Sequence, residues 1–254
     1  FIVHDLKVIS ETAERLGKKA DADRYRRQME ATTEAYIRKF VSKKGIVAKD
    51  YQSAYIMALK FVLPEGELRE QVKKNFAANI RKNGLQTGFF ATEHLLPLLV
   101  EAGETELAYD ILLQEGCPGW MYQVKCGATT TWERWDALKP DGTVNEEKMA
   151  GSGDNMVSFN HYAFGSVGEF YYQYILGIKP QKPGFAELHF EPYPDRRLGG
   201  VSGSYLSRAG KIESSWKYEE DGCHISLNTP VKSEVVLPNG QRETVEEGTY
   251  QWLC

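Results

Sequence analysis

The hydrophobic pattern changes its period once along this chain, close to Gly177, and this change limits the possible folds more than any other feature. Before it, apolar residues recur every three or four positions, as on the buried face of a helix. After it, apolar and polar residues alternate in short stretches, as in half-buried strands. The sequence therefore predicts a mainly α domain over residues 1–178 and an all-β domain over residues 179–254, which opens on a linker-like segment at residues 179–184.

The helical runs of the first domain follow one another with short connections. Runs are expected from Asp5 to Gly17, from Tyr25 to Phe40, from Tyr55 to Val62, from Leu68 to Gly84, around residues 95–99 and 107–113, and from Ser158 to Ile175. Short loops make successive helices antiparallel neighbours. No repeat of fixed period is evident, which disfavours a solenoid and favours a ring of paired helices. In such a ring the connections at residues 85–89 and 119–122 would gather at one end.

Beyond residue 184, β-prone stretches are separated by turns rich in Gly, Asp, Asn and Pro. They cover residues 186–191, 201–207, 211–218, 223–228 and 234–237. Several short strands at this spacing predict a small antiparallel β-sandwich.

Charge and cysteine content narrow the class of protein. The net charge is −4 and the basic residues are scattered, which argues against a nucleic-acid partner. No apolar run approaches the roughly 20 residues that span a bilayer. Four cysteines without metal-ligand spacing, Cys117, Cys126, Cys223 and Cys254, are expected to be free and mostly buried thiols. Together with the lack of a visible signal peptide, they favour a cytoplasmic protein. No cluster of metal-ligating residues is apparent, and we expect neither a metal nor a cofactor.

Glu133 lies between Trp132 and Trp135, and its surroundings allow two interpretations. In the structural one, Thr130 caps a helix, Glu133 completes a capping box three residues later, and the tryptophans belong to the core. In the catalytic one, a carboxylate between flat aromatic walls activates a water for attack on an anomeric carbon. The two can hold together, since a helix start would fix the direction of the side chain.

Two longer motifs carry a family resemblance. Residues 127–136, Gly-Ala-Thr-Thr-Thr-Trp-Glu-Arg-Trp-Asp, and residues 158–165, Ser-Phe-Asn-His-Tyr-Ala-Phe-Gly, resemble the bacterial α-L-rhamnosidases of glycoside hydrolase family 78. Residues 87–89, 107–109 and 168–169 are similar to the same family, so the resemblance extends over most of the chain. It implies part of an (α/α)6 toroid followed by an antiparallel β-sandwich, and hydrolysis of terminal α-L-rhamnosides with inversion.

The resemblance also implies roles for single residues. Glu133 matches the family's general base, and His161 matches a histidine that contacts bound rhamnose, although the residues alone also allow a structural His161 that bonds across the helical core. The implied walls of the sugar pocket are Trp120, Trp132 and Trp135. We expect Arg134 and Asp136 to orient their neighbours through a salt bridge.

One departure from the family concerns the general acid. The family carries it in an acidic, Arg-containing motif well before the base, and no such motif occurs between Phe1 and Thr129. An inverting site needs two carboxyl groups roughly 6.5–9.5 Å apart. The remaining carboxylates considered are Glu93, expected at the start of an apolar helix, and Glu169, in the last helical run. The chain also has fewer helical runs than a six-hairpin toroid requires.

We therefore expect a C-terminal fragment that lacks the general acid and whose partners are the missing N-terminal part and rhamnose-containing glycosides. Alternatives are a non-catalytic carbohydrate-binding or scaffolding module, and a toroid hydrolase or lyase that acts on another sugar. An incomplete toroid would expose apolar helix faces, so the isolated chain is expected to dimerise, aggregate or remain partly molten.

Overall fold

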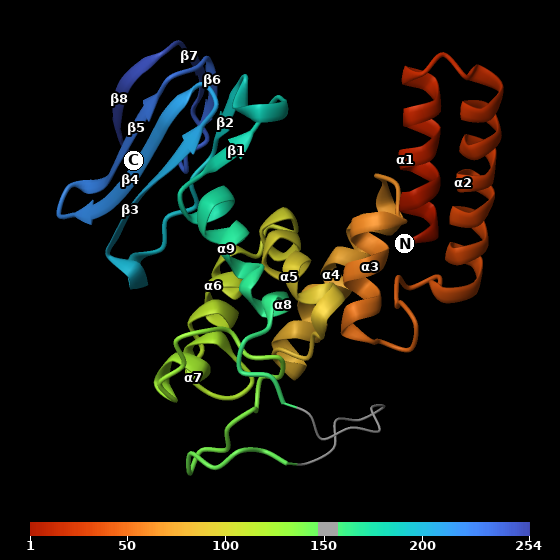
Figure 1. Ribbon diagram of the computed structural model, residues 1–254, viewed down its shortest axis with the longest axis horizontal. Coiled ribbons are helices and arrows are strands. Elements are labelled where there is room, and N and C mark those ends of the chain that lie inside the picture. The colour runs from red at the N-terminus through yellow and green to blue at the C-terminus, as the bar shows by residue number, and fades with distance from the viewer. Residues whose placement is uncertain (147–156) are drawn as a thin grey trace. The chain divides into compact units, whose positions relative to one another are not determined.

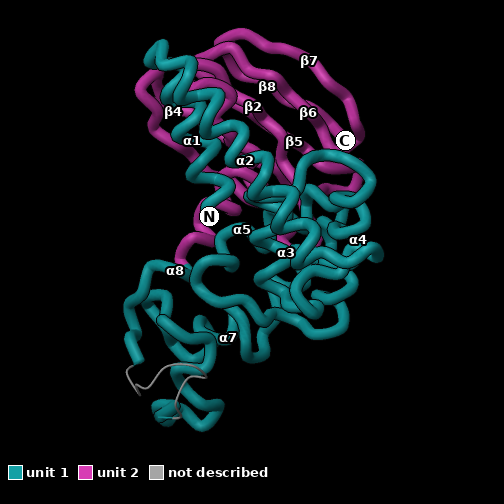
Figure 2. Tube along the Cα trace, turned by 90° about the vertical axis from the view of Figure 1, so that its right-hand side faces the viewer, with its two compact units in different colours: residues 1–164 teal, residues 165–254 magenta. Residues whose placement is uncertain are grey.

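The computed structural model describes residues 1–146 and 157–254, and the chain divides into two compact units, residues 1–164 and 165–254 (Figure 2). The first unit is built of helices and loops, and the second holds both sheets (Figure 1). The predicted order, a helical part followed by a β part, is confirmed. The division between the units falls within the last helical run that the sequence predicts.

The helices of the first unit pack as successive hairpins. They are α1 (Ile2–Arg15), α2 (Lys19–Phe40), α3 (Gln52–Phe61), α4 (Glu67–Asn83), α5 (Phe89–Glu101), α6 (Thr105–Leu113) and α7 (Trp120–Lys125). α1 packs on α2, α3 on α4, and α5 on α6, as the short connections predict. Among the described residues, no helix combines the length and the apolar character that a membrane crossing requires.

Glycines end the helices where the sequence predicts. At Gly17 the backbone adopts φ +72°, and the N–H of Lys18 donates to the carbonyl of Ala13 at 2.8 Å. Gly84 adopts φ +64° after the last turn of α4. Side chains disfavour this left-handed conformation, so glycine closes a helix here at little cost.

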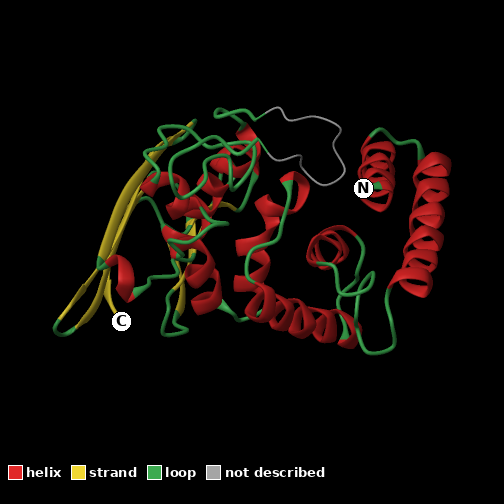
Figure 3. Cartoon of the chain, turned by 90° about the horizontal axis from the view of Figure 1, so that it is seen from below, coloured by secondary structure: helices red, strands yellow, loops and turns green. Residues whose placement is uncertain are grey.

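The capping box predicted at Thr130 is wrong. The described residues of 126–146 and 157–161 contain no helix (Figure 3, loops in green). The hydroxyl of Thr130 bonds to the carbonyl of Phe159, far along the chain, instead of capping its own turn. The last helical run begins at Tyr162 rather than Ser158, and it is divided into α8 (Tyr162–Gly165), α9 (Val167–Phe170) and a π-helical turn at Tyr171–Ile175.

The second unit is a two-sheet sandwich. Its strands are β1 (Ile178–Pro180), β2 (Leu188–Phe190), β3 (Gly200–Ser207), β4 (Gly210–Glu219), β5 (Gly222–Thr229), β6 (Ser233–Val236), β7 (Arg242–Val245) and β8 (Gly248–Leu253). The sheets run β1-β2-β6-β7 and β3-β4-β5-β8. Neighbouring strands are antiparallel, as predicted, except for the parallel pair β2–β6. Residues 179–184 are not a free linker, because Lys179 pairs with His189 across β1 and β2.

Large side chains from both sheets fill the space between them. Trp216 of β4 is 1% exposed, and its indole N–H donates to the carbonyl of Ile175 at 2.7 Å. The rings of Phe190 and Trp252, from opposite sheets, lie 6.0 Å apart. All four cysteines are free, as predicted, but only Cys223 is fully buried.

A charged cluster lies on the sheet that contains β1, β2 and β6. His189 lies 3.2 Å from Glu191 and 3.3 Å from Glu234, and Lys179 lies 2.9 Å from Glu191. The hydrogen bond to Glu191 raises the pKa of His189 above its usual value. The same bond, with help from Lys179, lowers the pKa of Glu191 to about 2.

The stability of the second unit should therefore be greatest in mildly acidic solution. Glu191 stabilises the fold above its unfolded pKa of about 4.3, and this contribution is lost as the pH falls towards about 2. His189 stabilises it fully below about pH 6.5, and this contribution is lost as the pH rises through its raised pKa. Hydrogen exchange of β2 amides across a pH series, corrected for intrinsic exchange rates, measures how the free energy of unfolding falls on the acidic and on the alkaline side of this maximum. His189→Gln should flatten the alkaline side of this dependence, and an unchanged alkaline side in that variant contradicts the assignment.

Candidate active site

The two motifs that carry the family resemblance lie side by side. The N–H of Glu133 donates to the carbonyl of Ser158 at 2.9 Å, and the N–H of His161 donates to the carbonyl of Thr131 at 2.9 Å. The hydroxyl of Thr131 returns a bond to the carbonyl of His161 at 2.7 Å. Residues 130–133 and 158–161 therefore form a short paired ladder, although about 25 residues of chain separate them.

The same ladder orients the carboxylate of Glu133. Its Oε2 accepts the N–H of Ser158 at 2.9 Å, so Glu133 is held through both its main chain and its side chain. This bond fixes the direction of the carboxylate, the task that a helix start would otherwise perform. Glu133 is half-buried and borders a hollow of about 420 Å³.

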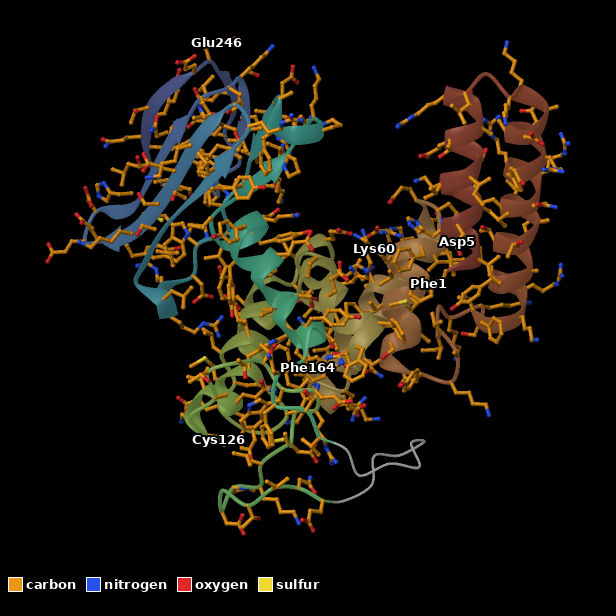
Figure 4. All side chains as sticks on the ribbon, viewed as in Figure 1. Phe1, Asp5, Lys60, Cys126, Phe164 and Glu246 are labelled. Atoms are coloured by element: carbon orange, nitrogen blue, oxygen red, sulfur yellow. The ribbon has the colours of Figure 1, made fainter. Side chains whose placement is uncertain are left out.

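The hollow has an apolar and a polar side. Its lining comprises Thr87, Gly88, Phe89, Cys117, Pro118, Glu133, Arg134, Trp135, Asp136 and Phe164. One of these lining residues, Phe164, is labelled in Figure 4 and is the last residue of the first unit. A mixture of aromatic faces and a few oriented polar groups is typical of small-molecule sites, and of sugar sites in particular.

Stacked aromatic rings build the apolar side. Trp135 lies parallel to Phe164 with ring centres 3.8 Å apart, and its indole N–H donates to the carbonyl of Thr87 at 3.1 Å. Trp120 meets Trp135 edge-on at 5.0 Å, and its own N–H donates to the carbonyl of Phe164 at 2.8 Å. These contacts fix the plane of Trp135 beside Glu133.

The three predicted pocket tryptophans therefore differ in position. Trp135 lines the hollow, whereas Trp120 and Trp132 are buried, at 6% and 3% exposure, and are not among its lining residues. Trp132 packs with Tyr122 and Ala137 in a small buried cluster. The core interpretation thus describes Trp132 but not Trp135, and Trp120 is buried as well.

The expected salt bridge is present on the polar side. Arg134 reaches Asp136 with two bonds, at 2.8 and 3.0 Å, and the side-chain amide of Asn145 donates to Asp136 at 2.7 Å. The Arg134 guanidinium holds the pKa of Asp136 below its usual value. The salt bridge therefore favours the ionised form of Asp136, which is unsuited to donating a proton.

His161 is close to the hollow but is not among the residues that line it. Its ring stacks on Phe89 with centres 4.6 Å apart, and its Nδ1 accepts the N–H of Ala163 at 3.3 Å. The stack on Phe89 and the bond from Ala163 hold the ring in place. Within the part of the chain that the structure describes, its side chain makes no bond across the helical core. Its contact with a sugar stays a prediction.

Glu93, the other carboxylate of the first unit that could act as the acid, does not line the hollow. Glu93 is exposed on α5 and lies beyond the first turn of that helix, contrary to the predicted position at its start. Glu169 accepts a bond from Gln173 at 2.6 Å within the second unit. Among the described residues that line the hollow, the carboxylates are those of Glu133 and Asp136.

Several residues that line the hollow have no role predicted from the sequence. Phe89 and Phe164 lie inside segments that carry the resemblance, so the motifs could have indicated them. Cys117 and Pro118 had no such signal. They reach the hollow only through the fold, because the loop before α7 passes beside residues 133–136.

Comparison with known proteins matches both parts of the chain to one family. Residues 1–175 match the bacterial alpha-L-rhamnosidase 6 hairpin glycosidase domain, and residues 177–251 match the bacterial alpha-L-rhamnosidase C-terminal domain. An alpha-L-rhamnosidase of Alteromonas sp. (strain LOR) is 35% identical over 94% of this chain and 26% of its own length. One of Streptomyces avermitilis is 32% identical over 98% of this chain and 24% of its own length. The chain thus spans about a quarter of the length of these curated relatives.

Solved structures of alpha-L-rhamnosidases also match this chain. The crystal structure of an alpha-L-rhamnosidase from Aspergillus terreus superposes with a TM-score of 0.89 at 29% identity, over 98% of this chain and 29% of that one. The alpha-L-rhamnosidase of Streptomyces avermitilis complexed with L-rhamnose superposes with a TM-score of 0.88 at 30% identity, over 98% of this chain and 26% of that one. By its sequence motifs, its fold and these matches, the chain belongs to the bacterial alpha-L-rhamnosidase family.

Proposed function

We propose that the protein to which this chain belongs hydrolyses terminal α-L-rhamnosides with inversion, and that Glu133 is its general base. The observation that carries this proposal is the carboxylate of Glu133, fixed by the N–H of Ser158 at the border of a hollow with an aromatic wall. The relatives named above as alpha-L-rhamnosidases, one of them solved with L-rhamnose, support the substrate class.

The chemistry assigned to Glu133 is proton removal from water. As the water oxygen bonds to the anomeric carbon, its proton passes to Glu133 and the bond to the leaving oxygen breaks. A second carboxyl group must protonate that oxygen from the opposite side. Among the described residues that line the hollow, Asp136 is the other carboxylate, and Arg134 holds its pKa below the usual value. The acidic, Arg-containing motif of the family does not occur between Phe1 and Thr129, so we assign the general acid to a part of the protein outside this chain.

If the general acid lies in another part of the protein, that part must pack against this chain to complete the site. On α1, Ile2 and Ile9 are exposed seven residues apart, which puts them on one helix face, and the exposed Leu16 follows directly after the helix. An apolar face of this kind requires a covering surface. We expect the isolated chain to be inactive and to self-associate through such surfaces.

The test of substrate class uses the full-length protein and chromogenic glycosides. An α-L-rhamnoside should be hydrolysed with a kcat/KM at least about a hundredfold above those of the matching α-L-mannoside, β-D-glucoside and β-D-glucuronide. The physical reason is the apolar wall of Phe89, Trp135 and Phe164, which suits the C5 methyl group of a 6-deoxy sugar better than a hydroxymethyl or carboxylate. Preferential cleavage of the glucoside or the glucuronide contradicts the proposal.

A binding module is the alternative favoured by a specific observation, since Asp136 is unsuited to act as the acid. Calorimetry of the full-length protein with L-rhamnose, beside the hydrolysis assay, separates the two. Binding of rhamnose without turnover of any rhamnoside would establish the module.

A further inference from the structure

The outward face of the β3-β4-β5-β8 sheet carries a row of short polar side chains. The register places Ser202 opposite Ser215, Ser215 opposite Ser226, and Ser226 opposite Gln251. Their neighbours along the strands, such as Trp216 and Ile225, are buried between the sheets. Because side chains alternate along a strand, the four polar residues face outward together and cross all four strands.

This row forms the floor of two adjoining hollows. One has a volume of about 740 Å³ and the other about 470 Å³, and both are lined by Ser202, Ser215 and Ser226. The rows on either side carry longer side chains, among them Lys217 and Glu213. Short serines between longer neighbours on a twisted sheet leave a trough that crosses the strands.

The floor differs from its sides in its hydrogen bonding. In the flanking rows, Asn228 donates to Glu213 at 3.0 Å, and Thr249 donates to Asn228 at 3.2 Å. Lys217 pairs with Glu219 at 2.9 Å. Within the described part of the chain, by contrast, the side chains of the four floor residues have no protein partner. The free donors and acceptors of this face are therefore concentrated along its floor.

We propose that this trough binds a neutral oligosaccharide, at a site separate from the hollow beside Glu133. Hydroxyl and amide groups both donate and accept, so they match the adjacent hydroxyls of a sugar chain. Adjacent strands lie about 4.8 Å apart, so a ligand that engages the whole row spans roughly 14 Å, which requires several sugar units.

The charges beside the floor determine the class of saccharide. The cationic groups of Lys217 and His224 already face Glu219 and Asp221, at 2.9 and 2.7 Å. Glu213 on the other side would repel a uronic acid. The trough thus suits an uncharged chain, with a dissociation constant on the order of millimolar because each solvent-exposed hydrogen bond contributes little.

The experiment uses the full-length protein, with cellotetraose, xylotetraose and a rhamnose-terminated tetrasaccharide as neutral probes and tetragalacturonic acid as the acidic probe. Calorimetry and saturation-transfer NMR are run in excess L-rhamnose, so that the hollow beside Glu133 is filled. At least one neutral probe should bind, and the acidic probe should bind at least tenfold more weakly.

Two variants test the floor independently. Ser215→Ala/Ser226→Ala/Gln251→Ala removes its hydrogen bonds, and Ser226→Tyr fills the trough. Each should weaken binding of the neutral probe at least tenfold. Leu206→Ala, an exposed change on the same sheet outside both hollows, should bind the probe as the unaltered protein does. All three should hydrolyse a small chromogenic rhamnoside at the unaltered rate.

Several results would overturn the proposal. These are failure of every neutral probe to bind in excess L-rhamnose, unchanged affinity in both floor variants, and tighter binding of the acidic probe. Protection of β4 and β5 side chains from hydroxyl-radical footprinting in the ligand-free full-length protein would also overturn it, because another part of the protein would then cover the trough.

Discussion

Glu133→Gln in the full-length protein is expected to lower kcat on an α-L-rhamnoside by roughly 10²–10⁴-fold. The amide cannot take a proton from water, which removes the base. Its side-chain oxygen can still accept the N–H of Ser158, which Glu133 receives at 2.9 Å, so the paired motifs should stay in place. Steady-state kinetics with thermal unfolding of the same samples measure both effects.

Glu93→Gln provides the matched control, since it makes the same chemical change at an exposed position on α5. Its kcat should lie within twofold of the unaltered protein. A loss of less than tenfold in Glu133→Gln would remove Glu133 from the role of base. A large loss accompanied by a collapse in thermal stability would identify it as a structural residue of the ladder instead.

Trp216→Ala is expected to cost about 3–5 kcal/mol of unfolding free energy in the second unit. The change removes a large side chain that is 1% exposed, and it leaves the carbonyl of Ile175 without the indole donor at 2.7 Å. Urea denaturation followed by hydrogen exchange of β4 and β5 amides measures the loss in that unit alone.

Trp216→Phe keeps most of the ring volume but not the N–H donor, so its cost should be smaller. The difference between the two variants separates packing from hydrogen bonding. A cost below about 1 kcal/mol for Trp216→Ala would contradict the placement of this ring in the shared core of the two sheets.

The sequence predicted the helices best where a local signal ends them. Gly17 and Gly84 each close a helix in a left-handed conformation, and that preference is a property of glycine alone. The Thr-x-x-Glu pattern at Thr130 suggested a helix start that is absent, because the same residue pattern occurs both in capping boxes and in extended segments. Only the bonds to residues 158–161 decide between the two, and no local pattern contains them.

In the β part as well, elements that depend on long-range pairing could not be predicted from a local pattern. The longer strands β3, β4 and β5 alternate over enough residues to be read directly, whereas β1 has three residues and ends at Pro180. Strand β1 exists because β2 pairs with it, and the parallel pairing of β2 with β6 joins segments more than 40 residues apart. Pairing of this kind is decided by the tertiary fold.

For the candidate site, the motifs indicated Glu133 and Trp135 together with the salt bridge of Arg134 and Asp136. They did not distinguish the tryptophan that lines the hollow from those that are buried. That distinction depends on α7, which places Trp120 against the edge of Trp135. Likewise, Phe89 reaches His161 only because the loop before α5 returns to the 158–161 segment.

The stereochemistry of the first product tests the central claim most directly. NMR spectra recorded during the first moments of α-L-rhamnoside hydrolysis by the full-length protein show which anomer of rhamnose forms before mutarotation. If Glu133 activates water for direct attack, β-L-rhamnose appears first. Initial release of α-L-rhamnose would show that a carboxylate attacks the sugar itself, and it would contradict the role of Glu133 as general base of an inverting site.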